Sequence, residues 1–328
     1  MRVAVFSTKP YDREFLNQAN QGLELSFFEP RLTVKTAALA AGHEAVCVFI
    51  NDCVSAGAIN DLAVGGTRII ATRSAGYNHI DLEAAQRLGL QVVRVPAYSP
   101  YAVAEHAVGL IMMLNRKLYK AYNRVRDDNF SLQGLLGFDL HGSTVGIVGT
   151  GKIGECFVRI MAGFGCRLLA YDPYPNPAVA ALGASYVDLP ELLSQSDVVS
   201  LHCPLLPSTY HLLDKESLQQ LKRGAMVINT SRGGLIDTAA MIDAIKSGQV
   251  GYLGIDVYEQ EGEIFFEDLS DTVIQDDDIQ RLQSFPNVVI TAHQGFFTRN
   301  ALENIANTTI ENIVKVSRGE QCENLVTV

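Results

Sequence analysis

Residues 143–172 read STVGIVGTGKIGECFVRIMAGFGCRLLAYD, which predicts a strand, a glycine turn, a helix, a second strand and an acid in that order. The apolar residues 145–148 predict the first strand, and residues 167–171 predict the second. A GxGxxG pattern alone is weak evidence. This one has a strand before it, a helix within it and an acid after it, which is the order of a dinucleotide-binding motif.

Each part of this stretch has a physical task in holding a dinucleotide. Gly149 permits the tight turn, Gly151 lets the backbone approach a pyrophosphate, and Gly154 lets helix and strand pack closely. The helix N-terminus offers free N–H groups to the anion. The carboxylate of Asp172 can accept hydrogen bonds from ribose hydroxyls and would repel a 2′-phosphate, so the stretch predicts NAD rather than NADP. The alternative is an ordinary glycine turn in an α/β domain.

Composition limits the remaining possibilities. The chain has 328 residues, enough for two domains, and its 48% hydrophobic content suits a large core. The net charge of −10 disfavours nucleic acid or an anionic membrane as partner, because both need a basic surface. The sequence has no apolar run long enough for a membrane span and no signal-peptide pattern, so we expect a cytoplasmic protein.

The cysteines and histidines do not predict a metal site. The six cysteines are scattered without a CxxC pair, and the seven histidines lack metal-ligand spacing. We therefore expect reduced cysteines and no metal. Cys203 follows an apolar run and is the cysteine expected to line a cleft.

Strands alternate with helices on both sides of the glycine motif, which predicts parallel α/β sheets. In the first hundred residues we expect helices at 11–21, 34–41 and 81–88 between short apolar strands. A long helical pattern over 101–127 is apolar early and basic late, which suits a helix that enters another domain or is buried against a second subunit. A final helix over 299–318 most simply returns to the first domain. We thus predict two doubly wound parallel-sheet domains: a flavodoxin-like, discontinuous substrate domain (1–100 and 299–328) and a Rossmann NAD-binding domain (101–298).

Ligands of open α/β sheets bind beyond the carboxyl ends of the strands, so polar residues there are candidates for chemistry. Arg232 follows the predicted strand 226–229 on a glycine loop and can grip a carboxylate. His293 follows the strand 288–291 and is a candidate general acid and base. Either Glu259 or Glu261 could orient that histidine, and His79 is the competing histidine.

Eight motifs carry a resemblance that covers nearly the whole chain. They are RSAGYNHIDL, VPAYSPYAVAEHA, VGIVGTGKIG, YDPYP, LHCPL, INTSRGGLID, DVYEQE and TAHQGFF. Together they resemble the NAD-dependent D-2-hydroxyacid dehydrogenases, and most of all the fermentative D-lactate enzymes among them.

The resemblance implies a catalytic trio of Arg232, Glu261 and His293. Arg232 would bind and polarise the 2-keto acid, and His293 would protonate the ketone oxygen during reduction. Glu261 would hydrogen-bond to His293 and keep it protonated to higher pH. The family spacing favours Glu261 over Glu259 for that task.

The resemblance also implies which residues surround the ligands. The expected substrate pocket has a carboxylate cradle and two aromatic walls: Ala75, Gly76, Tyr98, Phe49 and Phe296. The residues expected against NAD are Gly149, Gly151, Lys152, Ile153, Gly154, Asp172, Cys203, Pro204, Thr209, Thr230, Ser231, Arg232 and Asp256.

The implied function is reversible, NADH-dependent reduction of pyruvate to D-lactate by a homodimer or homotetramer. One alternative is a related enzyme for a bulkier 2-keto acid, glyoxylate or phosphoglycerate. Another is a non-catalytic NAD-sensing module like the co-repressors that share the fold. The intact trio favours catalysis.

Overall fold

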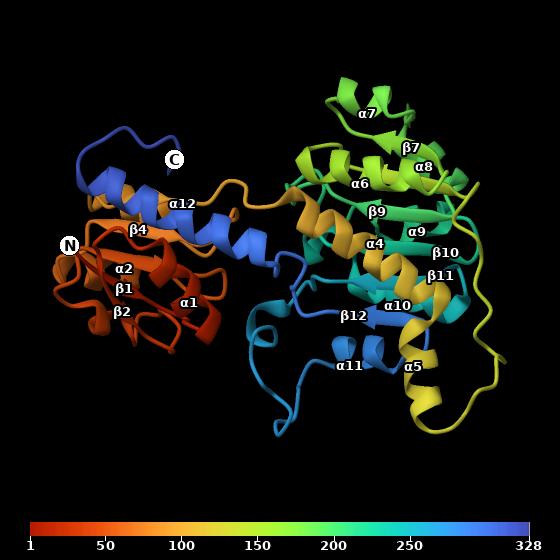
Figure 1. Cartoon of the computed structure of the whole chain (residues 1–328), viewed down its shortest axis with the longest axis horizontal. Coiled ribbons are helices and arrows are strands. Elements are labelled where there is room, and N and C mark those ends of the chain that lie inside the picture. The colour runs from red at the N-terminus through yellow and green to blue at the C-terminus, as the bar shows by residue number, and fades with distance from the viewer. Residues whose placement is uncertain (328) are drawn as a thin grey trace. The chain divides into compact units, whose positions relative to one another are not determined.

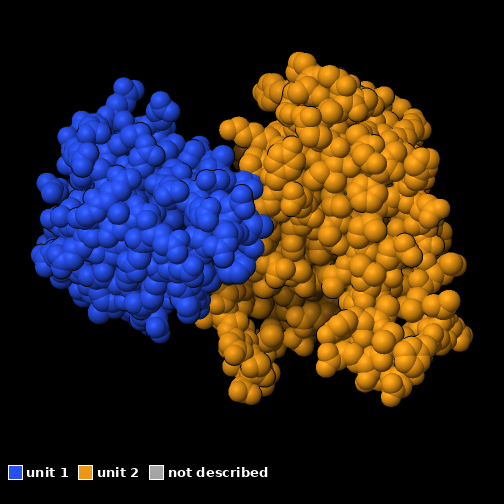
Figure 2. Space-filling model, in the orientation of Figure 1, with its two compact units in different colours: residues 1–99, 297–328 blue, residues 100–296 orange. Residues whose placement is uncertain are grey.

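The computed structural model describes residues 1–327 and divides them into two compact units, coloured separately in Figure 2. Unit 1 is built from Met1–Ser99 and the chain from Phe297 onward, and unit 2 is Pro100–Phe296. Val328, at the end of the predicted substrate domain, lies outside the described residues. Between residues 1 and 327, no helix combines the length and the apolar character that a membrane crossing would require.

Unit 2 is built on a seven-stranded parallel sheet in the order β12-β11-β10-β9-β6-β7-β8. Its strands are β6 (Thr144–Val148), β7 (Arg167–Tyr171), β8 (Ser185–Tyr186), β9 (Val198–Leu201), β10 (Ala225–Asn229), β11 (Val250–Ile255) and β12 (Val288–Ile290). The chain runs outward from β6 in one direction and then returns to β9 on its other side. The glycine turn after β6 therefore lies at the switch point of the sheet, where open α/β sheets bind their ligands.

Helices cover both faces of this sheet (Figure 1). They are α4 (Pro100–Arg116), α5 (Leu118–Arg126), α6 (Lys152–Gly163), α7 (Pro177–Ala181), α8 (Leu189–Gln195), α9 (Lys215–Gln220), α10 (Thr238–Ser247) and α11 (Asp277–Ser284), with the 3-10 helices η2 (Gly233–Leu235) and η3 (Glu261–Glu263). Side chains of α4, α6 and α7 form one core against the sheet, and those of α8 to α11 form the other. The central strands are buried on both faces, which explains their continuous apolar sequences.

The single long helix predicted over 101–127 is wrong. It breaks at Lys117, which has a left-handed φ of 49°, so α4 and α5 are separate helices. The apolar first half, including Leu110, Ile111 and Leu114, packs into the core of its own unit. The exposed apolar side chains lie instead on α5 and the segment after it, at Leu118, Tyr122, Val125, Phe130, Leu132 and Leu136.

Unit 1 has a six-stranded sheet in the order β13-β5-β4-β3-β1-β2. Its strands are β1 (Arg2–Val5), β2 (Glu24–Phe27), β3 (Ala45–Val48), β4 (Ile69–Thr72), β5 (Gln91–Val93) and β13 (Leu325–Val326). The first five are parallel in a flavodoxin-like order, and the edge strand β13 is antiparallel. The predicted fold class of two parallel-sheet α/β units is confirmed, with β13 as an addition.

The helices of unit 1 are α1 (Pro10–Ala19), α2 (Ala56–Val64), α3 (Leu82–Arg87) and α12 (Arg299–Ser317), with the 3-10 helix η1 (Ala37–Ala40). Figure 1 shows α12 lying along the sheet, where it packs on α1, β4 and β5. The α-helix predicted over 34–41 is wrong, because only the short η1 forms there. The hydroxyl of Thr36 donates to Arg31 O at 2.6 Å and accepts from Thr33 N at 2.8 Å, and such local bonds compete with α-helix formation.

Candidate active site

The three motif glycines of unit 2 each meet a different steric demand. Gly149 has φ +96°, and a Cβ there would lie 2.5 Å from Cys203 N, on the neighbouring strand's exit. A Cβ on Gly154 would lie 2.1 Å from Gly149 O, so helix α6 can pack against the turn only with glycine at that position. A Cβ on Gly151 would meet no atom within 4 Å, which leaves open space above the turn for a pyrophosphate.

The groups around this turn fit a dinucleotide. Helix α6 begins after Gly151 without a side-chain cap, so its first N–H groups point toward the open space. Asp172 accepts from Thr150 N at 2.7 Å and from Tyr174 N at 2.8 Å. The hydroxyl of Thr150 also donates to Asp172, at 3.1 Å. A carboxylate has about four acceptor positions, so one remains for a ribose hydroxyl.

The other residues expected against NAD lie at the carboxyl edge of the same sheet or just beyond it. Lys152 and Ile153 open α6, and Cys203 and Pro204 follow β9. Burial raises the pKa of the Cys203 thiol to about 11, so it is not a nucleophilic thiolate. The hydroxyl of Thr209 donates to Pro204 O at 2.7 Å and shapes that loop.

The loop after β10 holds three more residues of this set, Thr230, Ser231 and Arg232. The hydroxyl of Ser231 donates to Cys203 O at 2.6 Å. The Thr230 hydroxyl is buried and has no hydrogen-bond partner within residues 1–327. The side chain of Asn229 donates to Arg232 O at 2.8 Å and accepts from Ser231 N at 3.0 Å, while the Arg232 side chain itself is exposed. The loop is thus fixed at its base, and the exposed guanidinium donates from Nη1 to Ser231 O at 2.6 Å.

The structure brings Glu261 and His293 together. Glu261 Oε1 lies 2.8 Å from His293 Nδ1, and Glu261 Oε2 accepts from Tyr258 N at 2.9 Å. Both side chains are about one-fifth exposed, at 23% and 18%. The contact uses Nδ1, so Nε2 is the ring nitrogen left to exchange a proton with a substrate. The ring of Phe266 packs beside the imidazole, with its centroid at 5.8 Å.

The backbone at His293 is held in an unusual conformation by Asp256. His293 has φ +53°, a left-handed value that non-glycine residues adopt at a cost and that clusters at functional sites. Its N–H donates to Asp256 O at 2.7 Å, and the buried Asp256 carboxylate accepts from Gln294 N and Gly295 N, both at 2.8 Å. The same carboxylate accepts from Thr291 Oγ1 at 2.5 Å, so it anchors the whole segment after β12.

His106 completes this anchor from helix α4. Its Nε2 lies 3.0 Å from Thr291 Oγ1 and 3.3 Å from Asp256 Oδ1. Burial raises the pKa of Asp256, but the hydrogen bonds from His106 and Thr291 outweigh burial, so the net pKa is lowered. The sequence patterns did not single out His106. Its partners are some 150 or more residues away in the chain, and no local pattern announced them. A contact of Asp256 with NAD stays a prediction, since the structure engages both of its carboxylate oxygens within the chain.

Two other histidines are unsuited to proton transfer. Burial lowers the pKa of His79 to about 4, and its Nε2 lies 3.4 Å from Thr72 Oγ1 in unit 1. Burial lowers the pKa of His202 to about 3, and its Nε2 bonds to Ser200 Oγ at 2.9 Å. Both rings are therefore neutral near pH 7, which favours His293 over the competing His79.

The predicted substrate residues of unit 1 follow its strands. Ala75 and Gly76 come after β4, and within residues 1–327 their backbone N–H groups donate to no acceptor of the chain, so both are available to a carboxylate. Tyr98 O accepts from Asn304 Nδ2 at 2.6 Å, which ties the end of this segment to α12. Phe49 follows β3, and the predicted second wall, Phe296, is the last residue of unit 2 and is buried.

A buried arginine behind this region was not anticipated. Arg73, at the end of β4, is 2% exposed, and its guanidinium lies 5.5 Å from the centre of the Phe49 ring. It donates to Phe6 O at 3.1 Å, and its Nε lies 3.3 Å from Asp12 Oδ1. The only sign of this buried arginine in the sequence is that a charged residue ends an apolar strand.

Among the side chains that the structure describes, those of residues 1–262 and 264–327, no three of His, Cys, Asp or Glu group so as to hold a metal ion. The second predicted glutamate, Glu259, does not contact His293. Its carboxylate instead lies 2.7 Å from His211 Nε2.

Comparison with known proteins identifies the family. Residues 108–295 match the NAD-binding domain model of the D-isomer specific 2-hydroxyacid dehydrogenases, which confirms the predicted cofactor. D-lactate dehydrogenase of Escherichia coli is 54% identical over 326 residues, covering 99% of each chain. The solved apo-structure of D-lactate dehydrogenase from Escherichia coli has a TM-score of 0.93 at 51% identity, with all of both chains covered. A structure reported for the pyruvate reductase of Chlamydomonas reinhardtii has a TM-score of 0.95 at 48% identity, covering 99% of this chain and 98% of that one. The chain belongs to the D-isomer specific 2-hydroxyacid dehydrogenases, a family of NAD-dependent oxidoreductases.

Proposed function

We propose that this chain is an NAD-dependent D-lactate dehydrogenase that reduces pyruvate reversibly to D-lactate. Family membership already makes its substrate a small 2-keto or 2-hydroxy acid. The observation that carries the proposal is the 2.8 Å contact between Glu261 and His293 Nδ1, which leaves Nε2 as the proton-exchanging atom. The whole-chain likeness to a D-lactate dehydrogenase and to a pyruvate reductase supports pyruvate as the substrate.

In the proposed mechanism Arg232 binds the substrate carboxylate and polarises the keto group through paired N–H donors. His293, as imidazolium, donates the proton from Nε2 to the ketone oxygen during reduction and removes it during oxidation. Glu261 orients the ring through Nδ1 and favours its charged form. Bound NADH supplies the hydride that the carbonyl carbon accepts. The N–H groups of Ala75 and Gly76, with Tyr98, complete the carboxylate cradle, and Phe49 and Phe296 limit its size.

Replacement of His293 tests the mechanism. Asparagine tolerates a left-handed φ better than alanine, so His293→Asn removes the imidazole with the least backbone strain. We expect pyruvate reduction to fall by about 10²–10⁴-fold, the usual contribution of a general acid, while NADH still binds in a fluorescence titration. Near-normal turnover by this variant would show that another group transfers the proton.

Cofactor choice and substrate choice are tested separately. Asp172→Ala should relax the preference against NADPH, and unchanged selectivity would contradict the ribose assignment. NADH oxidation with pyruvate, 2-ketobutyrate, glyoxylate and phenylpyruvate distinguishes this enzyme from one for a bulkier or smaller keto acid. No turnover with any of the four would favour the NAD-sensing module.

We further propose that a second copy of the chain covers the exposed apolar side chains on α5 and the segment after it. Tyr122 and Val125 are 64% and 52% exposed, and Leu136 is 85% exposed, which is unusual for apolar groups without a partner. Light scattering should give at least twice the mass of one chain. Tyr122→Glu with Val125→Glu should yield a monomer, whereas the matched change Val64→Glu on α2, also exposed, should not.

We also propose that the enzyme works in the cytoplasm. The structure describes all six cysteines as unpaired, which is the usual pattern in a reducing compartment.

A further inference from the structure

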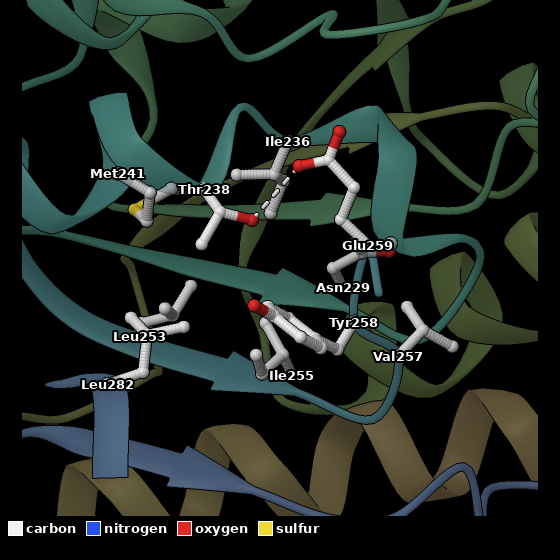
Figure 3. Close-up of a pocket in the computed structure, with 11 residues that line it drawn as sticks. Asn229, Ile236, Thr238, Met241, Leu253, Ile255, Val257, Tyr258, Glu259 and Leu282 are labelled. Atoms are coloured by element: carbon white, nitrogen blue, oxygen red, sulfur yellow. Dashed lines mark hydrogen bonds between the residues drawn. The ribbon is translucent and has the colours of Figure 1, made fainter. Parts of the chain in front are cut away.

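Glu259 is the centre of a second histidine–carboxylate cluster in unit 2. Its Oε1 lies 2.7 Å from His211 Nε2 and 3.1 Å from Tyr210 Oη. Its Oε2 accepts from Thr238 Oγ1 at 3.1 Å, a bond drawn in Figure 3. The Glu259 side chain is 19% exposed, so these bonds are largely shielded from water. The Glu259 carboxylate has about four acceptor positions, and donors from two other segments of the chain use three of them.

Each partner of Glu259 comes from a segment that is fixed elsewhere. Tyr210 and His211 stack ring on ring, with centroids 3.9 Å apart and an interplanar angle of 17°. Asp237 lies 3.9 Å from His211 Nδ1, and it caps helix α10 by accepting from Ala240 N. Thr238 is buried at the first residue of that helix. Glu259 is therefore hydrogen-bonded to side chains that are themselves held in place by other contacts.

The cluster contacts both parts of the proposed catalytic machinery. The N–H of His211 donates to Gly234 O at 2.8 Å, two residues after Arg232. A Cβ on Gly233 would lie 2.1 Å from Tyr258 C and 2.3 Å from Glu259 N, so the Arg232 loop packs directly on the segment that carries Glu259. The position of residues 258 and 259 thus affects the arginine loop.

The same segment determines where the carboxylate of Glu261 points. Tyr258 N donates to Glu261 Oε2, and the other oxygen of that carboxylate contacts His293. Tyr258 is itself held through its hydroxyl, which donates to Asp276 at 2.8 Å. Beside the segment lies a cavity of about 20 Å³, room for about one water molecule, lined by Tyr258, Glu259 and Thr238 among others (Figure 3).

We propose that Glu259, held by hydrogen bonds to His211, Tyr210 and Thr238, is a positioning residue. It keeps Glu261 in contact with His293, and it keeps the loop that carries Arg232 in place. This inference rests on the proposed function, because it assumes that Glu261 and Arg232 act as described above. Glu259 touches no substrate atom and acts through the backbone of residues 257–261.

Three substitutions separate positioning from simple stabilisation. Glu259→Ala removes all three bonds. Glu259→Gln keeps an acceptor oxygen and nearly the same shape, and is the conservative rescue. Asp197→Ala is the control, because the Asp197 carboxylate also accepts several hydrogen bonds (from Lys222 Nζ and Thr144 N, both at 2.8 Å) but lies at the amino ends of β6 and β9, away from the loops that carry Arg232 and His293.

The readouts are the pH dependence of kcat/KM for pyruvate, the KM values and the unfolding temperature of the full chain. For Glu259→Ala we expect kcat/KM to fall by about 10- to 100-fold, the cost of a misplaced catalytic group, with a raised KM for pyruvate and an unchanged KM for NADH. The alkaline limb of the profile should move to lower pH, because a displaced Glu261 no longer holds its carboxylate against His293 Nδ1. Glu259→Gln should restore most of the lost kcat/KM and bring the alkaline limb back toward its wild-type position. Asp197→Ala should lower only the unfolding temperature.

Several results would overturn the inference. One is a wild-type pH profile in Glu259→Ala, with or without a lower unfolding temperature. Another is an equal loss of kcat/KM in Glu259→Gln and Glu259→Ala, which would assign the effect to the lost negative charge of Glu259. If Glu259→Ala does not fold, His211→Asn, whose residue tolerates the φ of +51° found there, should show the same alkaline shift, and its absence would refute the proposal.

Glu261→Gln separates this failure from failure of the proposed function. If that variant keeps the wild-type alkaline limb, Glu261 does not orient His293 and the proposed mechanism fails. If it shifts the limb while Glu259→Ala does not, only the positioning role of Glu259 fails.

Discussion

Replacing Asp256 by alanine removes the acceptor that holds the chain around His293. Asp256 is 1% exposed, and its carboxylate accepts from Thr291 Oγ1, Gln294 N and Gly295 N. Gly295 is buried, so its N–H would be left without a partner at a cost of about 1–3 kcal/mol. The bonds from Thr291 and Gln294 can be replaced in part by water. We therefore expect Asp256→Ala to lower the free energy of unfolding of unit 2 by about 3 kcal/mol.

The matched substitution is Thr291→Val, which removes a single hydrogen-bond donor to Asp256 and keeps the side-chain shape. It should cost about 1 kcal/mol, the typical net value of one hydrogen bond. For a unit of about 200 residues, 1 kcal/mol shifts Tm by about 2–4 °C, so scanning calorimetry should find Asp256→Ala about 6–12 °C less stable and Thr291→Val about 2–4 °C. Equal shifts in the two variants would refute the view that one carboxylate anchors the segment after β12.

The activity of Asp256→Ala supplies a second check. With its anchor gone, the left-handed backbone at His293 should relax, and turnover should fall further than NADH affinity. If turnover is unchanged at a temperature where the variant is folded, His293 does not depend on Asp256 for its position.

Three further predictions concern other parts of the molecule. Gly154→Ala would place a Cβ 2.1 Å from Gly149 O, so we expect both NADH affinity and Tm to fall, and a normal dissociation constant in an NADH titration would contradict the close packing. Arg73→Met leaves the Asp12 carboxylate buried without its cation, and urea unfolding should show a loss of about 3–5 kcal/mol. His79 has its pKa lowered to about 4 by burial, so the unfolded state binds its proton first as the pH falls below about 6.5, and stability should decline from there toward pH 4. At pH 5 that loss is about 2 kcal/mol, and His79→Gln should reduce the acid dependence of Tm; an identical dependence would show that another group is responsible.

The parts of the fold with local causes were predictable from the sequence. The glycine turn depends on Gly149 and Gly154, whose steric demands arise within one strand–turn–helix unit. Helix α10 begins and ends at local signals, the Asp237 cap and Gly248 with φ +73°. The alternation of strands and helices then limits the arrangement to parallel sheets.

Other features had no recognisable pattern in the sequence. The hydroxyls of Thr33 and Thr36 look compatible with a helix until their mutual bonds are seen. No proline or glycine at Lys117 indicates that the helix breaks there. Position after the strand left Glu259 and Glu261 as equal candidates to orient His293, and only the family resemblance favoured Glu261. In the folded chain Glu259 contacts His211 and Glu261 contacts His293.

The return of the chain to unit 1 has a consequence for biosynthesis. Domains generally fold as units during synthesis, N-terminal parts first. Residues 1–99 emerge before unit 2, yet the helix α12 that covers β4 and β5, and the edge strand β13, are made only after Phe296. An apolar face of the unit 1 sheet therefore stays uncovered until all of unit 2 has been translated. During that interval the exposed apolar face makes the nascent chain prone to aggregation.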